Sequence, residues 1–385
     1  RLPAGVQLFS MFLAHPELLD LVAEILGSAP KLAGHLAQTP TLLDAVLSPD
    51  FHRGLPDRNA LAADLADTLA RAGDFQDVLD LSRAWARDRR FQVGVQVMRG
   101  RIAARESGIM LSDLAEVLMA ALLPNVETEF AATSGRIAGA EFAIVALGKL
   151  GARALTSGSD LDLVFLYDAP ADAVSDGARP LPAATYFARL GQRFLAALSA
   201  PTAEGALFEV DMRLRPSGAS GPIATSLPAF QQYHRDKAWT WERMALTRAR
   251  VVAAGDAFRQ RVEDELRAIL TARRDPEALL RDVAEMRARI EREKSSANPW
   301  RVKYVRGGLL DLEFLAQYLI LCHAADHPDL LTGDTAEAFT RLERAGILDP
   351  ALADRLRDAV RLAASRRSCA SVIPTTLMKP PRPTP

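Results

Sequence analysis

Residues 142–168 constrain the fold more than any other stretch of this chain. They contain two apolar runs, at positions 144–147 and 163–167, and each run is bounded by turn-forming residues. Short apolar runs with such boundaries predict β-strands. The segment between the runs is rich in Gly, Ser and Thr. The sequence therefore predicts a small sheet in which two strands are joined by a polar loop.

Two aspartates mark the start of the second predicted strand. Alternation along a strand places Asp160 and Asp162 on one face and Leu161 and Leu163 on the other. Neighbouring carboxylates repel each other unless a cation lies between them, and their oxygen atoms suit Mg²⁺ or Mn²⁺. The same triplet also fits a solvated, charged edge strand, so on its own it does not decide between these two interpretations.

Two further segments favour the metal interpretation. Gly148-Lys149 follows the first strand and supplies backbone N–H groups and an ammonium group where phosphates can bind. Residues 207–215 alternate between polar and apolar side chains, which predicts another strand. Its polar face carries Glu209, Asp211, Arg213 and Arg215. Acids beside paired arginines suit a site that holds metal and phosphate together, so we expect three carboxylates to bind two metal ions for in-line phosphoryl chemistry.

These motifs together resemble a known family. The chain is similar to the nucleotidyltransferase pattern of the DNA polymerase β-like superfamily, in that Gly148-Lys149 is followed after ten residues by Asp160-Leu161-Asp162. That pattern usually has Gly-Gly or Gly-Ser at the position of Gly-Lys, but Lys149 matches a narrower family. Over residues 70–365 the chain resembles the glutamine synthetase adenylyltransferases. The segments that carry this resemblance are GKLGAR, SGSDLDLVFLYD, LFEVDMRLRPSG, AWTWERMALTRAR and YVRGGLLDLEFLAQYL.

The resemblance implies an activity and its partners. Enzymes of that family have two nucleotidyltransferase halves, one adding AMP to a tyrosine of glutamine synthetase and one removing it by phosphorolysis. This chain contains one copy of the nucleotidyltransferase half, and its motif sequences resemble the C-terminal half, which adds AMP. The resemblance implies ATP as the substrate, Mg²⁺ as the cofactor and glutamine synthetase as the protein partner. It also implies a PII-type signalling protein and glutamine as effectors.

The resemblance also assigns site residues. The predicted catalytic and metal-binding residues are Asp160, Asp162 and Asp211, with Asp211 also accepting the proton of the attacking tyrosine. The predicted nucleotide-binding residues are Gly148, Lys149, Gly158, Ser159, Arg213 and Arg215. Among these, the cationic side chains and Ser159 are expected to stabilise charge on the leaving pyrophosphate.

Three other functions stay open at this point. The first is the opposite reaction of the same family, removal of AMP. The second is a glycosyltransferase that uses Asp-x-Asp to hold a nucleotide sugar, although no sugar-nucleotide domain is evident. The third is a non-catalytic helical regulatory scaffold, against which the joint presence of Asp160, Asp162, Asp211 and Lys149 argues.

The rest of the chain predicts an α+β protein that is mostly α, with a small mixed sheet flanked by helical bundles. We expect a helical linker or regulatory domain over 1–135, a nucleotidyltransferase domain over 136–232, a C-terminal helical bundle over 233–365 and a Pro-rich, disordered tail over 366–385. Pro124 is expected to stop a helix, and residues after 233 to be helical throughout. Asp311 and Glu313 diverge on a helix and are expected to be structural or interfacial.

Composition excludes several classes of protein. The net charge of −1 gives no electrostatic reason to expect a nucleic-acid partner. Cys322 and Cys369 are too few for a disulfide framework, which indicates a reducing cytoplasm. We expect no membrane span and no signal peptide. The chain opens at Arg1 without an initiator Met, as expected of a fragment of a longer protein.

Overall fold

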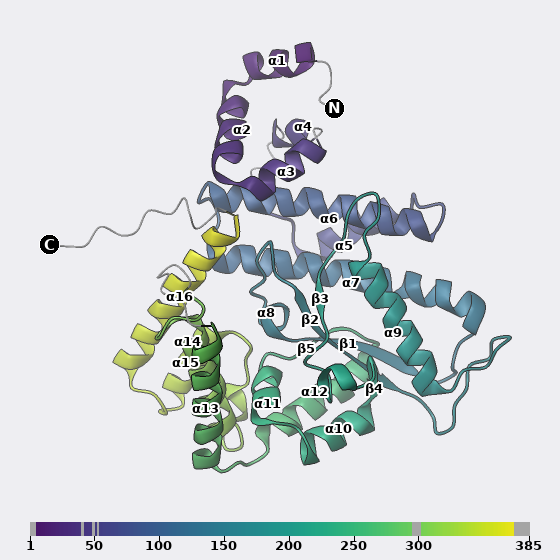
Figure 1. Ribbon diagram of the computed structural model, residues 1–385, viewed down its shortest axis with the longest axis vertical. Helices are drawn as coiled ribbons and strands as arrows, with labels where there is room; N and C mark the ends of the chain where they lie inside the picture. The colour runs from purple at the N-terminus through teal and green to yellow at the C-terminus, as the bar shows by residue number, and fades with distance from the viewer. Residues whose placement is uncertain (1–4, 40–41, 48–50, 52–53, 295–301, 373–385) are drawn as a thin grey trace.

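The computed structural model describes residues 5–39, 42–47, 51, 54–294 and 302–372. Helices make up most of this part of the chain, and a five-stranded mixed sheet lies among them (Figure 1). The predicted class, α+β and mostly α, is therefore confirmed.

The sheet is built around a central antiparallel pair of strands. Its strands are β1 (Glu141–Ala146), β2 (Leu161–Asp168), β3 (Val210–Asp211), β4 (Ala224–Ser226) and β5 (Arg250–Ala253). β1 pairs antiparallel with β2 on one side and with β5 on the other. β3 and β4 both run parallel to β2, β3 at its first two residues and β4 further along. Two short strands therefore share one edge of β2.

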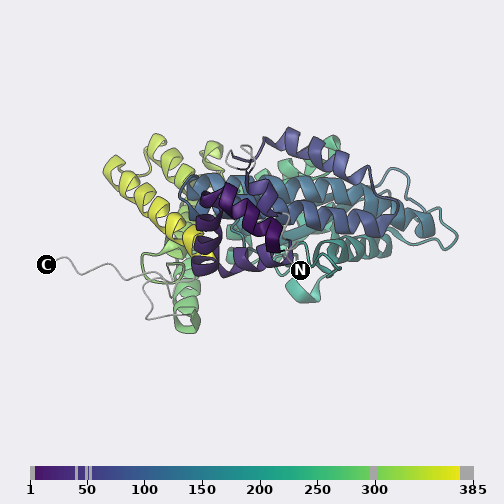
Figure 2. The same cartoon turned by 90° about the horizontal axis from the view of Figure 1, so that it is seen from above.

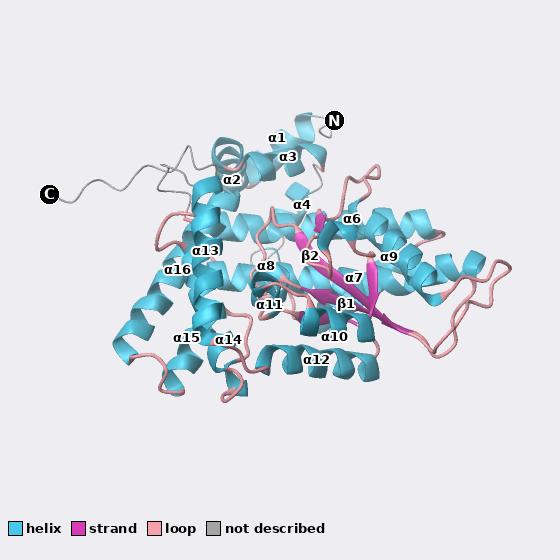
Figure 3. Ribbon diagram, turned by 60° about the horizontal axis from the view of Figure 1, so that its bottom comes forward, coloured by secondary structure: helices cyan, strands magenta, loops and turns pink. Residues whose placement is uncertain are grey.

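Helices cover both faces of the sheet (Figure 3). Phe142 and Ile144 of β1 belong to a core with the helices of one layer, whereas Ala143 and Val145 belong to the core of the other layer. The first layer contains α5 (Arg58–Leu69), α6 (Phe75–Met98), α7 (Ala104–Ser134) and α9 (Ala183–Ser199). The second contains α10 (Leu227–Asp236), α11 (Thr240–Leu246), α12 (Asp256–Thr271) and α13 (Pro276–Lys294). Burial on both faces explains why the strand sequences are continuously apolar.

Helix α7 runs unbroken through Pro124, so the prediction that this proline stops a helix is wrong. Proline removes one helical hydrogen bond, but Leu122, Leu123 and Val126 around it are buried in the core and stabilise the helix. By length and composition α7 is also apolar enough to cross a membrane, contrary to our expectation that no such stretch exists. Of that apolar stretch, 61% is buried inside the protein, which accounts for its composition.

Helices from the two ends of the chain extend this core. Four short helices, α1 (Gly5–Ala14), α2 (Pro16–Ser28), α3 (Pro30–Gln38) and α4 (Leu42–Leu47), lie over α6 and pack around its Phe91 and Val95 (Figures 1 and 2). At the other end, α14 (Leu309–His323), α15 (Thr335–Arg344) and α16 (Pro350–Val372) form a separate small core.

Two expectations about the C-terminal part are wrong. Strand β5 interrupts the stretch after residue 233 that we expected to be helical, because Val251 and Val252 are β-branched and buried beside β1. Helix α16 continues to Val372, so the helical pattern does not end at 365. The remaining residues of the predicted disordered tail, 373–385, lie outside the described residues.

A buried arginine connects the helical layer to the segment that leads into β3. Arg83 of α6 donates hydrogen bonds to the carbonyl oxygens of Ala197, Ala200 and Gly205, at 2.9, 2.7 and 2.8 Å. These bonds satisfy carbonyl groups at and beyond the end of α9, which its own helix leaves without partners. The path of the chain from α9 to β3 is thereby fixed.

Candidate active site

Two of the predicted acids lie side by side on adjacent strands. Asp162 of β2 pairs in parallel register with Asp211 of β3, and Leu161 pairs with Val210. Residues in register on neighbouring strands project from the same face of a sheet, so the two carboxylates share a face. Asp160 immediately precedes β2. Acids from two distant segments of the chain are thus brought to the start of one strand.

The strand that carries Asp211 is much shorter than we predicted. Only Val210 and Asp211 pair with β2, rather than the whole of 207–215. Further along β2, residues 165–167 pair with β4, so the edge is already occupied and the chain turns away. Arg213 and Arg215 therefore lie in a turn and not on a strand.

Arg215 closes that turn. Its guanidinium donates to the carbonyl oxygens of Met212, Ala219 and Gly221, at 2.8, 3.2 and 3.2 Å. These bonds hold together the segment that follows Asp211.

Arg213 holds Asp211 itself. Its Nε lies 3.0 Å from Oδ1 and 2.8 Å from Oδ2, and its backbone N–H donates to Oδ1 at 2.8 Å. These hydrogen bonds keep the pKa of Asp211 below its ordinary value. The Arg213 side chain is 81% exposed, so it has room to exchange this partner for another anion.

Asp162 lies in an environment that disfavours its charge. Burial, and after it the nearby Asp160 and Asp211, raise the pKa of Asp162 to about 6, although Lys149 and Lys303 act in the opposite direction. The cations present do not compensate for burial and for the neighbouring acids. Such a site gains free energy when it binds a cation.

The donor set suits a hard divalent cation, but the side chains do not surround one point. Among the described residues, no three acidic, histidine or cysteine side chains lie close enough together to hold one ion. Arg213 instead occupies both oxygens of Asp211. Three carboxylates at the start of β2 and on the neighbouring β3, one of them with a raised pKa, suit Mg²⁺ in chemistry and in charge.

The predicted Gly-Lys turn is a one-turn helix, α8 (Gly148–Gly151), which begins directly beside Asp162. Gly148 has a φ of +52°, and a Cβ at this position would lie 2.0 Å from Oδ2 of Asp162. Only glycine fits here, because any other residue would be strained and would displace the carboxylate. The Leu147 N–H also donates to the Asp162 carbonyl at 2.9 Å, which fixes the start of α8 against β2.

Lys149 connects α8 to the loop that precedes Asp160. Its Nζ donates to Ser159 Oγ at 2.9 Å, and the same oxygen accepts the Thr156 N–H at 3.0 Å. Gly158 is exposed in this loop. The structure thus brings together Gly148, Lys149, Ser159 and the acids.

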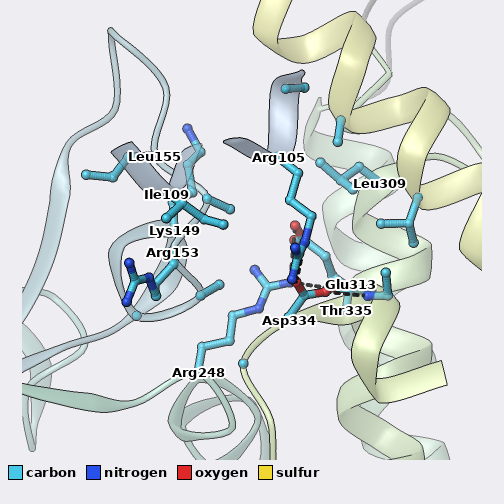
Figure 4. Close-up of a pocket in the computed structure, with 18 of the residues that line it drawn as sticks. Arg105, Ile109, Lys149, Arg153, Leu155, Arg248, Leu309, Glu313, Asp334 and Thr335 are labelled. Atoms are coloured by element: carbon cyan, nitrogen blue, oxygen red, sulfur yellow. Dashed lines mark hydrogen bonds and ion pairs between the residues drawn. The ribbon is translucent and has the colours of Figure 1, made fainter. Parts of the chain in front are cut away.

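A cavity of about 430 Å³ opens beside Lys149 (Figure 4). Lys149 and Arg153 line one side of it and Glu313 and Thr335 the other, with Arg248 between them. Arg248 donates to Thr335 Oγ1 at 2.9 Å and pairs with Glu313 at 3.2 Å. The cavity therefore lies between the sheet domain and the C-terminal helices, and Glu313 lies at that interface.

A comparison with protein families identifies the chain. The model described as glutamate-ammonia ligase adenylyltransferase matches residues 19–265, which is more than half of the chain. The chain belongs to this family. A second model, described as GlnD PII-uridylyltransferase, matches residues 277–368.

Two curated relatives of this adenylyltransferase-family chain are both named bifunctional glutamine synthetase adenylyltransferase/adenylyl-removing enzyme. The protein of Rhodopseudomonas palustris (strain ATCC BAA-98 / CGA009) is 44% identical over 359 residues, which are 93% of this chain and 36% of the relative. The protein of Xanthobacter autotrophicus is 46% identical over 360 residues, again 93% and 36%. The chain thus spans little more than a third of the length of the curated relatives it matches.

Sequence reasoning missed a buried acid that supports α8 in this family member. Glu116 of α7 is fully buried and accepts hydrogen bonds from Arg58, at 2.6 Å, and from Arg250 of β5. Arg250 also donates to the carbonyl oxygens of Leu150 and Gly151 in α8, at 2.9 and 3.2 Å. The only signal in the sequence is a single acid inside the apolar run of α7.

Lys303 was also missed. It is exposed, yet its charge lowers the pKa of Asp162 from the C-terminal side of the molecule. Asp311, close by, pairs with Arg287 of α13 and accepts the Gly307 N–H at 2.7 Å. This carboxylate therefore joins two C-terminal helices, in keeping with the structural role that we expected for it.

Proposed function

We propose that this chain transfers AMP from ATP to a tyrosine hydroxyl of glutamine synthetase, which lowers the activity of that enzyme and regulates nitrogen assimilation in the cytoplasm. The observation that carries the proposal is the register pairing of Asp162 with Asp211, beside Asp160 and next to Lys149. The family membership and the names of the relatives support it.

Asp160, Asp162 and Asp211 would hold Mg²⁺ in this reaction. When bound, Mg²⁺ neutralises charge on the triphosphate and activates the attacking hydroxyl. The raised pKa of Asp162 supports this role, because a carboxylate that is buried among other acids ionises most readily when a cation accompanies it.

Arg213 has two anionic partners available in the proposed reaction. In the resting protein it holds Asp211, and it is exposed enough to bind the triphosphate instead. Release of Arg213 would free the oxygens of Asp211 and raise the pKa of that carboxyl, since the hydrogen bonds from Arg213 are what lower it. Asp211 could then accept the proton of the attacking tyrosine hydroxyl.

Lys149 and Ser159 would stabilise the leaving pyrophosphate. Their hydrogen bond at 2.9 Å places an ammonium and a hydroxyl group together where α8 begins. Gly148 and Gly158 remain predicted backbone contacts of the nucleotide, and Arg215 remains a predicted phosphate contact. In the structure Arg215 holds the turn that contains Arg213 closed. The 430 Å³ cavity beside Lys149 lies within the usual size range of small-ligand sites and would receive the rest of the nucleotide.

The partners follow from the same proposal. Glutamine synthetase is the protein substrate, because the relatives are named for it. A PII-type protein and glutamine are the proposed effectors, and the match of residues 277–368 to a PII-uridylyltransferase model supports the first of these.

The test is an assay with α-phosphate-labelled ATP, Mg²⁺ and purified glutamine synthetase. We expect label on glutamine synthetase with the wild-type chain and a loss of at least about three orders of magnitude with Asp162→Asn, since metal-assisted charge stabilisation supplies several kcal/mol. Near-wild-type transfer by that variant would exclude the proposed role of Asp162.

The opposite reaction of the family is tested separately. Incubation of AMP-modified glutamine synthetase with phosphate yields ADP if the chain removes AMP. ADP without any label transfer in the first assay would assign the chain to removal. Binding of ATP and Mg²⁺ with neither reaction would assign it to a non-catalytic role.

A further inference from the structure

A second cavity lies on the other side of the loop that carries Ser159. It has a volume of about 300 Å³ and is bounded by α6, by residues 155–159 and by residues 206–209, which lead into β3. It shares only Leu155 and Thr156 with the residues that line the cavity beside Lys149. We call it the Arg90 cavity, after the one basic side chain among its lining residues.

Arg90 has no anionic partner within the described part of the chain. Its guanidinium lies 4.2 Å from the centroid of the Phe208 ring, and it forms no ion pair and no side-chain hydrogen bond with any described residue. Burial lowers its pKa to about 10, which still leaves it charged at neutral pH. Arg90 is only partly buried. A charged guanidinium that lines a cavity without a hydrogen-bonding partner among the described residues nevertheless favours an anion there.

The neighbouring arginines of α6 have carboxylate partners, so an arginine without an anionic partner is not a general feature of this helix. Arg89 stacks on Trp85 at 4.1 Å much as Arg90 stacks on Phe208, but Arg89 also pairs with Asp64. Arg87 pairs with Glu204 at 2.6 Å. Arg90 differs from both in that its unpaired charge lies against a cavity.

Other groups in the Arg90 cavity are compatible with an anion. The N–H of Gly158 has no acceptor among the described residues, so a second donor is available. Glu209 also lines the cavity, but it is exposed and forms no ion pair with Arg90, and water screens its charge.

We propose that the Arg90 cavity binds a small oxyanion, either a carboxylate or a phosphate, through the guanidinium of Arg90. Arginine binds both groups with two parallel hydrogen bonds, and the guanidinium of Arg90 also lies over the Phe208 ring. The cavity is lined by Gly158 and Ser159, and Ser159 also binds Lys149, so an anion there contacts the loop that positions the acids. This site goes beyond the proposed AMP transfer and stands whether or not the chain transfers AMP.

The test is calorimetric titration of the metal-free, nucleotide-free chain with inorganic phosphate, pyrophosphate and succinate. The variants are Arg90→Gln and, as a matched control, Arg89→Gln, which removes the adjacent stacked arginine that already has a carboxylate partner. Hydrogen bonds to charged groups are the stronger ones, so we expect Arg90→Gln to weaken binding by at least about tenfold and Arg89→Gln to leave it unchanged. Binding of only the phosphates, or of only succinate, identifies the source of the oxyanion.

A second measurement uses only the wild-type chain and therefore does not depend on the variants folding. The same anions should protect Arg90, and not Arg89, from modification by phenylglyoxal, as read by peptide mass spectrometry. Absence of anion binding to the wild-type chain, equal binding by a folded Arg90→Gln variant, or modification of Arg90 that no anion slows would each overturn the proposal.

Discussion

Asp162 on β2 and Asp211 on β3 stand opposite each other in parallel register, in one of the two residue pairs that join β3 to β2. The pairing has an electrostatic consequence, because Asp211 and Asp160 both raise the pKa of the partly buried Asp162 carboxyl. Arg213 offsets the charge of Asp211 through hydrogen bonds. Among the described residues, no arginine forms such hydrogen bonds with Asp162. Lys149 and Lys303 offset the charge of Asp162 only in part, so a bound cation would stabilise this carboxylate further.

The raised pKa of Asp162 predicts a pH-dependent gain in stability for Asp162→Asn. The folded-state pKa of about 6 lies above the ordinary value of 3.8, so the contribution of Asp162 to stability is fully present below the lower value and is lost as the pH rises through the higher one. In metal-free buffer the variant should therefore be more stable than wild type at about pH 8. We expect the free energy of unfolding of the variant, compared with that of wild type, to increase by about 2 kcal/mol between acidic pH and pH 8, after allowing for the partial exposure of Asp162.

Chemical denaturation in the presence of a chelator, at several pH values, measures this difference. Excess Mg²⁺ should narrow it at high pH by stabilising only the wild-type protein. A difference between wild type and Asp162→Asn that does not change with pH would show that burial does not penalise this charge.

Gly148→Ala should separate backbone strain from damage to the site. The new methyl group would lie 2.0 Å from Oδ2 of Asp162, at a φ of +52°. Gly346→Ala is the matched control, with a φ of +71° and no atom within 4 Å of the added Cβ. Both variants should lose about 1–2 kcal/mol of stability from left-handed backbone strain. Only Gly148→Ala should also lose AMP transfer, by about 100-fold, because the carboxylate is displaced.

Measured stability together with transfer rates for the two alanine variants decides this point. Equal loss of activity in both would mean that the contact between Gly148 and Asp162 has no part in catalysis.

Glu116→Gln should destabilise the protein strongly, although the residue lies in the helical domain. Glu116 is fully buried between Arg58 and Arg250, and loss of its charge leaves Arg250 with only carbonyl partners. Removal of one partner of a buried ion pair costs about 3–5 kcal/mol. Glu141→Gln, which removes a partly exposed partner of Arg261, should cost less than about 1 kcal/mol.

Urea denaturation of both glutamine variants tests this difference. Because Arg250 also binds the α8 carbonyl groups, we expect Glu116→Gln to raise the KM for ATP as well. A cost for Glu116→Gln no greater than that for Glu141→Gln would contradict the structural role assigned to Glu116.

Local pattern was enough to predict β1, β2 and the acids at the start of β2. Apolar runs between turn residues have few other interpretations, and a period of two along a strand sets which residues share a face. The length of β3 was not predictable in this way. The alternation of residues 207–215 suits a long strand, but β4 occupies the edge of β2 that such a strand would need. Strand length here is decided by tertiary competition for one edge.

The supporting residues of the site were hidden for a similar reason. Glu116 is a single acid in an apolar helix, and its partners Arg58 and Arg250 come from distant parts of the chain. Arg213 lies two residues beyond Asp211, as the sequence requires, yet only the turn after β3 brings its guanidinium back onto that carboxylate. Pairings of this kind depend on the folded path of the chain rather than on spacing.

Binding of Mn²⁺, followed by electron paramagnetic resonance, tests most directly whether Asp162 and Asp211 share a cation. Wild type should bind Mn²⁺ in competition with Mg²⁺. Asp162→Asn and Asp211→Asn should each weaken Mn²⁺ binding by at least about tenfold, because substitution of residues that only support a metal's ligands already has an effect of that size. Undiminished Mn²⁺ affinity in a folded Asp211→Asn variant would show that the two strands do not hold one ion between them, and would contradict the proposed catalytic centre.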